Sequence, residues 1–244
     1  MTSPATHPDT DAPHELEFTG QAASWMNLIL EKDPALPFAE ARCERRSQGS
    51  QQRRDLTLLG AGTPVILVLG DSLSAGYGIP LDRSWVNLLQ LRLKERGYPH
   101  RVVNASISGD TTGGGLIRLP AALERERPAI VILELGANDG LRGQPIMAMA
   151  ANLSRLIELG QKAGARVLLA EMRIPPNYGP SYTEKFQATF GQLAKHYGIP
   201  LIPFLLDGVA GDPALIQDDG LHPRAEAQGR ILDNVWPVLE AALK

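Results

Sequence analysis

The sequence predicts an α/β protein, a flavodoxin-like three-layer α/β/α sandwich with about five parallel strands. From residue 65 onward, short apolar runs alternate with longer segments in which apolar residues recur every three or four positions. The first of them, Val65–Leu69, is continuously apolar, which is typical of a strand buried on both faces of a sheet. Such strands are parallel and need helices on both faces, joined by right-handed crossovers.

Five apolar runs are expected to be strands: Val65–Leu69, Arg101–Asn104, Ala129–Leu135, Arg166–Glu171 and Ile199–Phe204. The segments with helical periodicity are Ser84–Arg96, Gly113–Arg127, Pro145–Gly164, Ser181–Tyr197 and Ala225–Leu243. In the first of these, Ser84 can cap the start and Gly97 can end the helix. The strict alternation of the two kinds of segment predicts a single domain over residues 63–244.

The charge of the chain is unevenly divided. Residues 1–63 carry six Lys/Arg and nine Asp/Glu, whereas the remaining eighteen of each, in residues 64–244, sum to zero. A neutral domain lacks the basic footprint of a nucleic-acid-binding protein, so we expect no nucleic-acid partner. A single cysteine, Cys43, excludes an internal disulfide framework and any multi-cysteine metal site.

Residues 1–62 predict a disordered or weakly structured extension. They begin with a Pro-, Thr- and Asp-rich stretch, and Trp25, Leu28 and Ile29 share a face that would allow a turn or two of helix. No apolar run approaches the roughly 20 residues of a membrane-spanning helix. The chain also starts without the basic residues and apolar core of a secretory signal, which favours a cytoplasmic protein.

Polar loops lie at the expected carboxyl edge of the sheet, where α/β proteins bind their ligands. They comprise residues 70–72, 106–111, 136–140 and 218–223. Gly70-Asp71-Ser72 by itself is also a common turn sequence. A serine becomes a nucleophile only beside a base that is itself held in one tautomer.

Elimination identifies the histidine that could be this base. Four of the five histidines lie in the extension, in a turn or at a helix end: His7, His14, His100 and His196. His222 alone falls in a strand-end loop with acids beside it, and Asp219 stands three residues before it across a glycine. The alternative is that Asp218, Asp219 and His222 simply decorate a surface turn.

These loops resemble the four sequence blocks of the GDSL/SGNH hydrolases, in the same order: Gly70-Asp71-Ser72-Leu73, Ser108-Gly109-Asp110, Gly136-Ala137-Asn138-Asp139 and Asp219-Gly220-Leu221-His222-Pro223. The similarity covers residues 64–244. It is strongest to the bacterial thioesterase/lysophospholipase/arylesterase branch, through residues 111–120 and 173–179. Relatives usually begin with an export signal, so a periplasmic location is the alternative to a cytoplasmic one.

The resemblance implies a serine hydrolase with Ser72 as nucleophile, His222 as base and Asp219 as its orienting partner. It also implies an oxyanion hole made by the Ser72 and Gly109 amides and the Asn138 side chain. A glycine amide can approach the oxyanion closely, and an asparagine amide donates without titrating. We expect a monomer that needs no cofactor or metal and acts on a small-molecule acyl ester or thioester: acyl-CoA, a lysophospholipid or an aryl ester.

The acyl group is expected in an apolar groove. One wall would be Leu116 and Ile117, behind a mobile Gly113-Gly114-Gly115 loop, and the other would be Ile174, Pro175 and Tyr178. Each methylene buried there would favour binding by about 0.8 kcal/mol. If these residues pack inward instead, a short-chain carbohydrate acetylesterase of the same family is the alternative.

Two other classes of function fit the sequence less well. Asp71, Asp110 and Asp139 could form a carboxylate Mg²⁺ site and make the protein a phosphohydrolase, but Ser72, Asn138 and His222 would then have no role. A non-catalytic ligand-binding module would leave the Ser, Asp and His set unexplained in the same way. Reaction of Ser72 with a fluorophosphonate distinguishes such a module from an active esterase.

Overall fold

The expected strands form one parallel sheet in the computed structural model, which describes residues 62–244. The strands are β1 (Val65–Gly70), β2 (Arg101–Asn104), β3 (Ile130–Glu134), β4 (Arg166–Ala170) and β5 (Leu201–Ile202). Their order in the sheet is β2-β1-β3-β4-β5, and every neighbouring pair is parallel. The predicted sheet of about five parallel strands is therefore confirmed.

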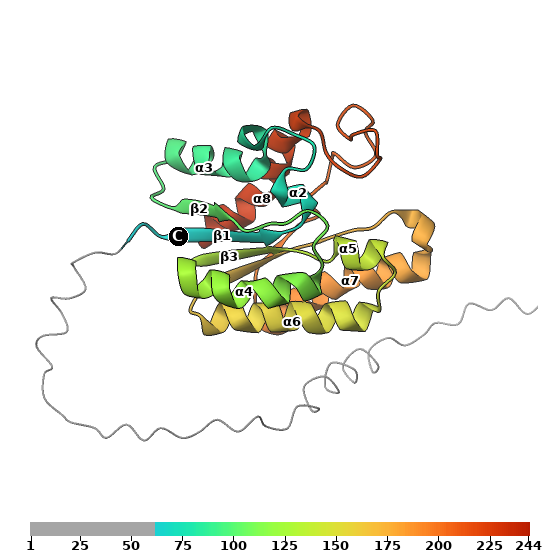
Figure 1. Ribbon diagram of the computed structural model, residues 1–244, viewed down its shortest axis with the longest axis horizontal. Helices are drawn as coiled ribbons and strands as arrows, with labels where there is room; N and C mark the ends of the chain where they lie inside the picture. The colour runs from blue at the N-terminus through green and yellow to red at the C-terminus, as the bar shows by residue number, and fades with distance from the viewer. Residues whose placement is uncertain (1–61) are drawn as a thin grey trace, which may run out of the picture. The chain divides into compact units, whose positions relative to one another are not determined.

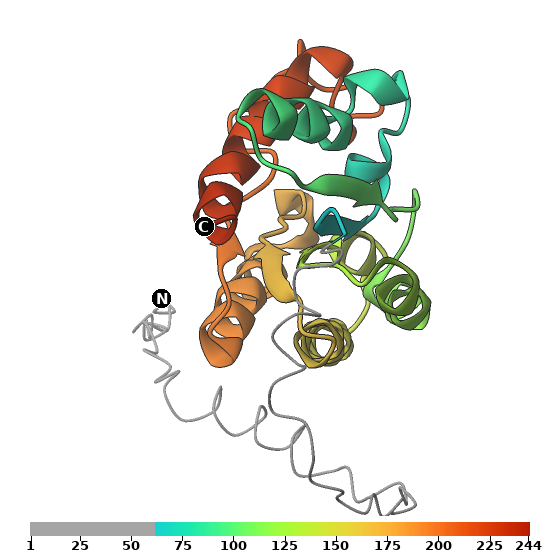
Figure 2. The ribbon, with the colours of Figure 1, turned by 90° about the vertical axis from the view of Figure 1, so that its left-hand side faces the viewer.

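Helices cover both faces of this sheet (Figures 1 and 2). One layer contains α3 and α8, which contact each other, and the other contains α4, α6 and α7. Two short helices, α2 and α5, follow β1 and β3 directly. The bounds are α2 (Ser72–Ala75), α3 (Trp85–Glu95), α4 (Thr112–Glu126), α5 (Ala137–Leu141), α6 (Ile146–Lys162), α7 (Pro180–Tyr197) and α8 (Gln228–Ala242). Short 3-10 turns span Leu81–Arg83, Pro176–Tyr178 and Ala225–Ala227.

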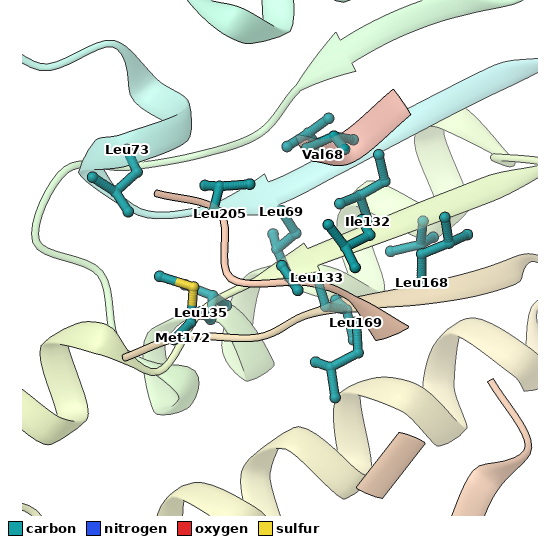
Figure 3. Packing of buried hydrophobic residues seen from close by; sticks show 14 of the residues in the cluster. Val68, Leu69, Leu73, Ile132, Leu133, Leu135, Leu168, Leu169, Met172 and Leu205 are labelled. Atoms are coloured by element: carbon teal, nitrogen blue, oxygen red, sulfur yellow. The ribbon is translucent and has the colours of Figure 1, made fainter. Parts of the chain in front are cut away.

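The core is built on β1, which lies between β2 and β3 and is buried along its whole length. Ile132 on β3 and Leu168 on β4 continue this apolar layer across the sheet (Figure 3). Burying a side chain of this size contributes about 1.5–3 kcal/mol. The core continues past the strand ends through Leu73 and Met172, so the loops at the carboxyl edge rest on packed side chains.

Two elements differ from what the sequence predicts, each for a local reason. β5 spans two residues rather than six, because Pro200 and Pro203 on either side lack the N–H that a sheet ladder requires. The three glycines of residues 113–115 lie in the first turn of α4, not in an open loop. A Cβ on Gly115 would stand 2.3 Å from Leu135 Cδ1, so this glycine permits close packing of the helix on the sheet.

The predicted extension, including the helical turn around Trp25, lies outside the described residues, and the domain limits of 63–244 stay a prediction. Within residues 62–244, no helix combines the length and apolar character needed to cross a membrane.

Candidate active site

Ser72 is placed by the sharp transition from β1 to α2. Gly70 ends the strand, and the Asp71 side chain caps the helix by accepting a hydrogen bond from the Leu73 amide at 3.1 Å. Ser72 is then the first residue of α2, with 9% of its surface exposed. Because a first-turn amide has no partner within its own helix, the Ser72 N–H is available to a ligand.

His222 reaches Ser72 from a loop near the C-terminal end of the chain. Its Nε2 lies 2.9 Å from Ser72 Oγ, and its Nδ1 lies 2.6 Å from Asp219 Oδ2. The other Asp219 oxygen accepts hydrogen bonds from the backbone amides of Leu221, at 2.9 Å, and His222, at 3.0 Å. The structure thus brings the predicted serine, histidine and aspartate into one hydrogen-bonded chain.

The charge of Asp219 is set by this loop. Partial burial raises its pKa, but the His222 and Leu221 amides and the His222 ring together lower the pKa to about 2. The adjacent Asp218 behaves differently, since its side chain is 97% exposed and pairs with Arg224 at 2.6 Å. Of the two neighbouring acids, Asp219 therefore supports the histidine.

Asn138 and Gly109 come from the loops that follow β3 and β2. Asn138 lies in α5, and its Nδ2 donates to Asp71 Oδ2 at 3.0 Å, which turns the amide toward the β1–α2 junction. Gly109 adopts a positive φ of 79°, and its carbonyl accepts a hydrogen bond from Arg142 Nη2 at 2.8 Å. The first contact ties α5 to Asp71, beside Ser72, and the second ties the Gly109 loop to the end of α5.

Asp139, in α5, connects the Asn138 region to the start of α4, which follows the Gly109 loop. Its carboxylate is buried and accepts hydrogen bonds from the Thr112 amide at 2.8 Å and the Thr112 hydroxyl at 2.6 Å. Asp110 pairs with Arg118, and Asp71 accepts from Leu73 and Asn138. The three carboxylates considered for Mg²⁺ are thus held by separate protein partners. Within residues 62–244, no group of three or more potential metal ligands is gathered.

A cavity of about 450 Å³ opens beside the serine. Its polar end holds Asp71, Ser72, Asn138 and His222, and the rest of its wall is mainly apolar. The expected wall residues Ile174 and Pro175 line it. So do several apolar residues that were not expected in the wall: Leu141, Met172, Phe204, Leu206, Ile216 and Leu221.

The remaining expected wall residues are not part of the cavity lining. Ile117 is 83% exposed on α4, and Leu116 packs against the hydrophobic core. Tyr178 is turned to donate its hydroxyl to the Leu141 carbonyl at 2.8 Å. The opposing wall comes instead from the segment after β5, residues 204–216. Its signal in the sequence was an apolar stretch, FLLDGVAGDPALI, directly ahead of the histidine loop.

The chain is similar to known proteins in sequence. Residues 68–230 match the GDSL-like Lipase/Acylhydrolase family. The chain is 49% identical over 183 residues to Esterase TesA of Pseudomonas aeruginosa, which covers 75% of this chain and 91% of that protein. It is 43% identical over 178 residues to the Thioesterase 1/protease 1/lysophospholipase L1 of Escherichia coli K12, covering 73% and 84%.

Solved structures show the same likeness. The crystal structure of TesA superposes with a TM-score of 0.72 at 49% identity, covering 73% of this chain and 99% of that one. The psychrotrophic esterase EstA from Pseudoalteromonas sp. superposes with a TM-score of 0.71 at 44% identity, covering 73% and 98%. The identity is high over nearly the whole length of these relatives. The chain therefore belongs to the GDSL-like lipase/acylhydrolase family and is a serine hydrolase that acts on ester bonds.

Proposed function

We propose that this protein hydrolyses acyl esters and thioesters through an acyl-enzyme formed on Ser72, with His222 as general base and Asp219 as its orienting partner. The observation that carries the proposal is the chain of hydrogen bonds from Ser72 Oγ through His222 to Asp219, at 2.9 and 2.6 Å. This chain ends at the polar end of an apolar cavity. A nucleophile, its base and the group that orients the base are the parts that acyl transfer requires.

In the first half-reaction, Ser72 Oγ attacks the carbonyl carbon while its proton passes to His222 Nε2. The carbonyl oxygen becomes an oxyanion, which the amides of Ser72 and Gly109 and the side chain of Asn138 would stabilise. As the tetrahedral intermediate collapses, the imidazolium returns the proton to the leaving alcohol or thiol. Water then attacks the acyl-enzyme, with His222 again as base, and releases the carboxylic acid and Ser72.

Asp219 has two effects on this sequence. By accepting from Nδ1, it keeps the proton on that nitrogen and leaves Nε2 free to take the serine proton. Since hydrogen bonds lower the pKa of Asp219 to about 2, it is ionised at neutral pH and stabilises the imidazolium that forms.

The cavity favours an unbranched acyl chain as substrate. Its walls are mainly apolar, so each buried methylene would contribute about 0.8 kcal/mol to binding. A sugar acetate, by contrast, needs hydrogen-bond partners for its hydroxyl groups. We propose acyl-CoA, lysophospholipid and aryl esters as the substrate class. We further propose a monomer, because one chain supplies every reacting group; light scattering during size-exclusion chromatography tests this.

The substrate class is tested by kcat/KM for p-nitrophenyl esters from acetate to palmitate, with octanoyl- and palmitoyl-CoA alongside. We expect a maximum at a medium or long chain. The cavity-lining variant Ile174→Ala should lower kcat/KM for the long chains by about tenfold relative to acetate. Ile117→Ala, which removes an exposed side chain of the same type, is the matched control and should leave the profile unchanged. A steep fall beyond acetate together with activity on acetylated sugars would contradict the proposed substrate.

A further inference from the structure

Glu134 is a buried acid for which the mechanism above has no role. It is the last residue of β3 and has no exposed surface. Glutamate is almost never fully buried without partners, because a desolvated carboxylate is costly. A glutamate at this position therefore requires a specific reason.

The contacts of Glu134 lie on both sides of the serine. Its Oε2 accepts hydrogen bonds from the Ser74 hydroxyl at 2.6 Å and from the Asp71 amide at 3.2 Å. The carboxyl group also lies against the end of β1, because a Cβ on Gly70 would stand 2.3 Å from the same oxygen. The glycine of the Gly70-Asp71-Ser72 turn thus makes room for Glu134.

Asp71 extends this contact to the oxyanion site. Its backbone amide is held by Glu134, while its carboxylate accepts from the Leu73 amide and from Asn138 Nδ2. Glu134 and Asp71 together therefore connect the turn that carries Ser72 with the side chain of Asn138. Ser72 therefore lies between Asp71, whose amide donates to Glu134, and Leu73, whose amide donates to Asp71.

The two buried acids cannot both be charged without a large cost. Burial and then the Asp71 charge raise the pKa of Glu134 well above its ordinary value, and hydrogen bonds from Ser74 and the Asp71 amide only partly oppose this. Burial also raises the pKa of Asp71, to about 6, although the Leu73 amide and the charge of His222 oppose the increase. These shifts favour the protonated form of Glu134, whereas Asp71, with a pKa of about 6, is ionised at neutral pH.

We propose that Glu134 is a positioning residue that acts as a neutral acid, fixing the Ser72 turn and, through Asp71, the Asn138 amide of the oxyanion site. The inference rests on the proposed function. It has a consequence for catalysis, because a second negative charge under the site where the oxyanion forms would raise the energy of the transition state. The groups that face the pair are the Ser74 hydroxyl, the Leu73 and Asn138 amides and His222.

The test compares two substitutions of Glu134 in the full-length chain, with kcat and KM for one p-nitrophenyl ester measured from pH 6 to 10. Glu134→Gln keeps the shape of a neutral acid, so kcat at pH 7 should stay within about fivefold of wild type. Glu134→Leu removes the acceptor and should lower kcat by about 10²-fold, with little change in KM. Titration with a fluorophosphonate normalises each rate to active enzyme.

The pH profile separates positioning from simple stabilisation of the fold. Wild-type kcat should fall at alkaline pH as Glu134 ionises, whereas kcat of Glu134→Gln should stay level over the same range. Glu126→Gln is the matched control, since Glu126 pairs with Arg101 and Arg125 before β3 begins and should keep the wild-type profile. The inference is overturned if Glu134→Gln loses as much kcat as Glu134→Leu, or if it keeps the alkaline fall.

Ser72→Ala, measured in the same series, distinguishes the two levels of the proposal. We expect it to be inactive. Wild-type turnover in Ser72→Ala would overturn the proposed function and this inference together. An inactive Ser72→Ala combined with a Glu134→Gln that behaves like Glu134→Leu would overturn the inference alone.

Discussion

Asp219 and Glu134 are both acids held close to Ser72, yet their surroundings act on them in opposite directions. Asp219 lies in a loop, with 38% of its side chain exposed, and backbone amides lower its pKa to about 2. Glu134 lies at the end of a central strand with no exposed surface, and burial raises its pKa. Sequence separation differs as well: Asp219 is three residues from His222, whereas Glu134 is 60 or more residues from its partners.

The difference follows the charge that the proposed reaction develops. Positive charge would appear on His222, where the protein keeps an ionised carboxylate within 2.6 Å. Negative charge would appear near Asn138, whose side chain donates to Asp71, and the backbone amide of Asp71 is held by Glu134, an acid whose pKa is raised by burial. Three predictions test this division of roles, in order of decreasing effect.

The largest effect is expected from the two groups that exchange the proton. Ser72→Ala and His222→Ala should each lower kcat by about 10⁴–10⁶-fold, because nucleophile and base act as a unit. Asp219→Ala should cost less than either, since the base remains but loses its orientation. Steady-state kinetics on a p-nitrophenyl ester measures all three.

Asp218→Ala is the matched control for Asp219→Ala, because it removes the same group one residue away, from a side chain that points to Arg224. We expect its kcat to remain near the wild-type value. A greater loss in Asp218→Ala than in Asp219→Ala would mean that the role assigned to Asp219 is wrong.

An intermediate effect is expected on the side where negative charge develops. Asn138→Ala should lower kcat by about 10²–10³-fold, the usual scale for one oxyanion donor. KM should change little, because the donor acts mainly in the transition state. If kcat/KM falls by the same factor only because KM rises, with kcat unchanged, Asn138 acts in substrate binding instead.

The smallest effect is on stability, and its sign differs between the two acids. A raised pKa means that the folded state keeps a proton that the unfolded state releases near pH 4.5, so the contribution of Glu134 declines as pH rises above that value. Asp219 contributes stability above pH 3.8, and this is lost as pH falls through about 2.

Thermal unfolding against pH measures both contributions. The Tm of Glu134→Gln should rise relative to that of wild type as pH rises from 5 to 9. The expected rise is about 2–4 °C for each kcal/mol by which the free energy of unfolding of wild type declines. Asp219→Asn should lose Tm near neutral pH and approach wild type as pH falls toward 2. A constant difference in Tm across this range for both variants would contradict the opposite pKa shifts.

Much of this architecture could be predicted from sequence because the buried strands are apolar: β1 is an unbroken apolar run, and β3 and β4 are apolar except for one charged residue at an end. The short helices α2 and α5 could not, since four or five residues carry no periodicity and are set by the turns before them. The residues around Ser72 were found through loop motifs. The apolar wall after β5 was not, because only the folded chain brings it opposite Ile174.

The role of Glu134 cannot be predicted from the sequence, although its position within an apolar run is unusual. Glu134 is the one charged residue in AIVILEL, a run whose apolar residues predict only a strand. An acid in an otherwise apolar strand cannot be matched to its partners from sequence alone, because Asp71 and Ser74 lie more than 50 residues away. The structure supplies those partners.

The two prolines beside β5 also bear on how copies of this protein meet. β5 forms one margin of the sheet, where unpaired backbone groups can recruit a strand from another molecule and start aggregation. Leu201 and Ile202 offer only a two-residue template, and Pro200 and Pro203 interrupt any extension of it. This margin is therefore a poor template for strand addition, and we expect the protein to resist joining sheet to sheet there when it is concentrated.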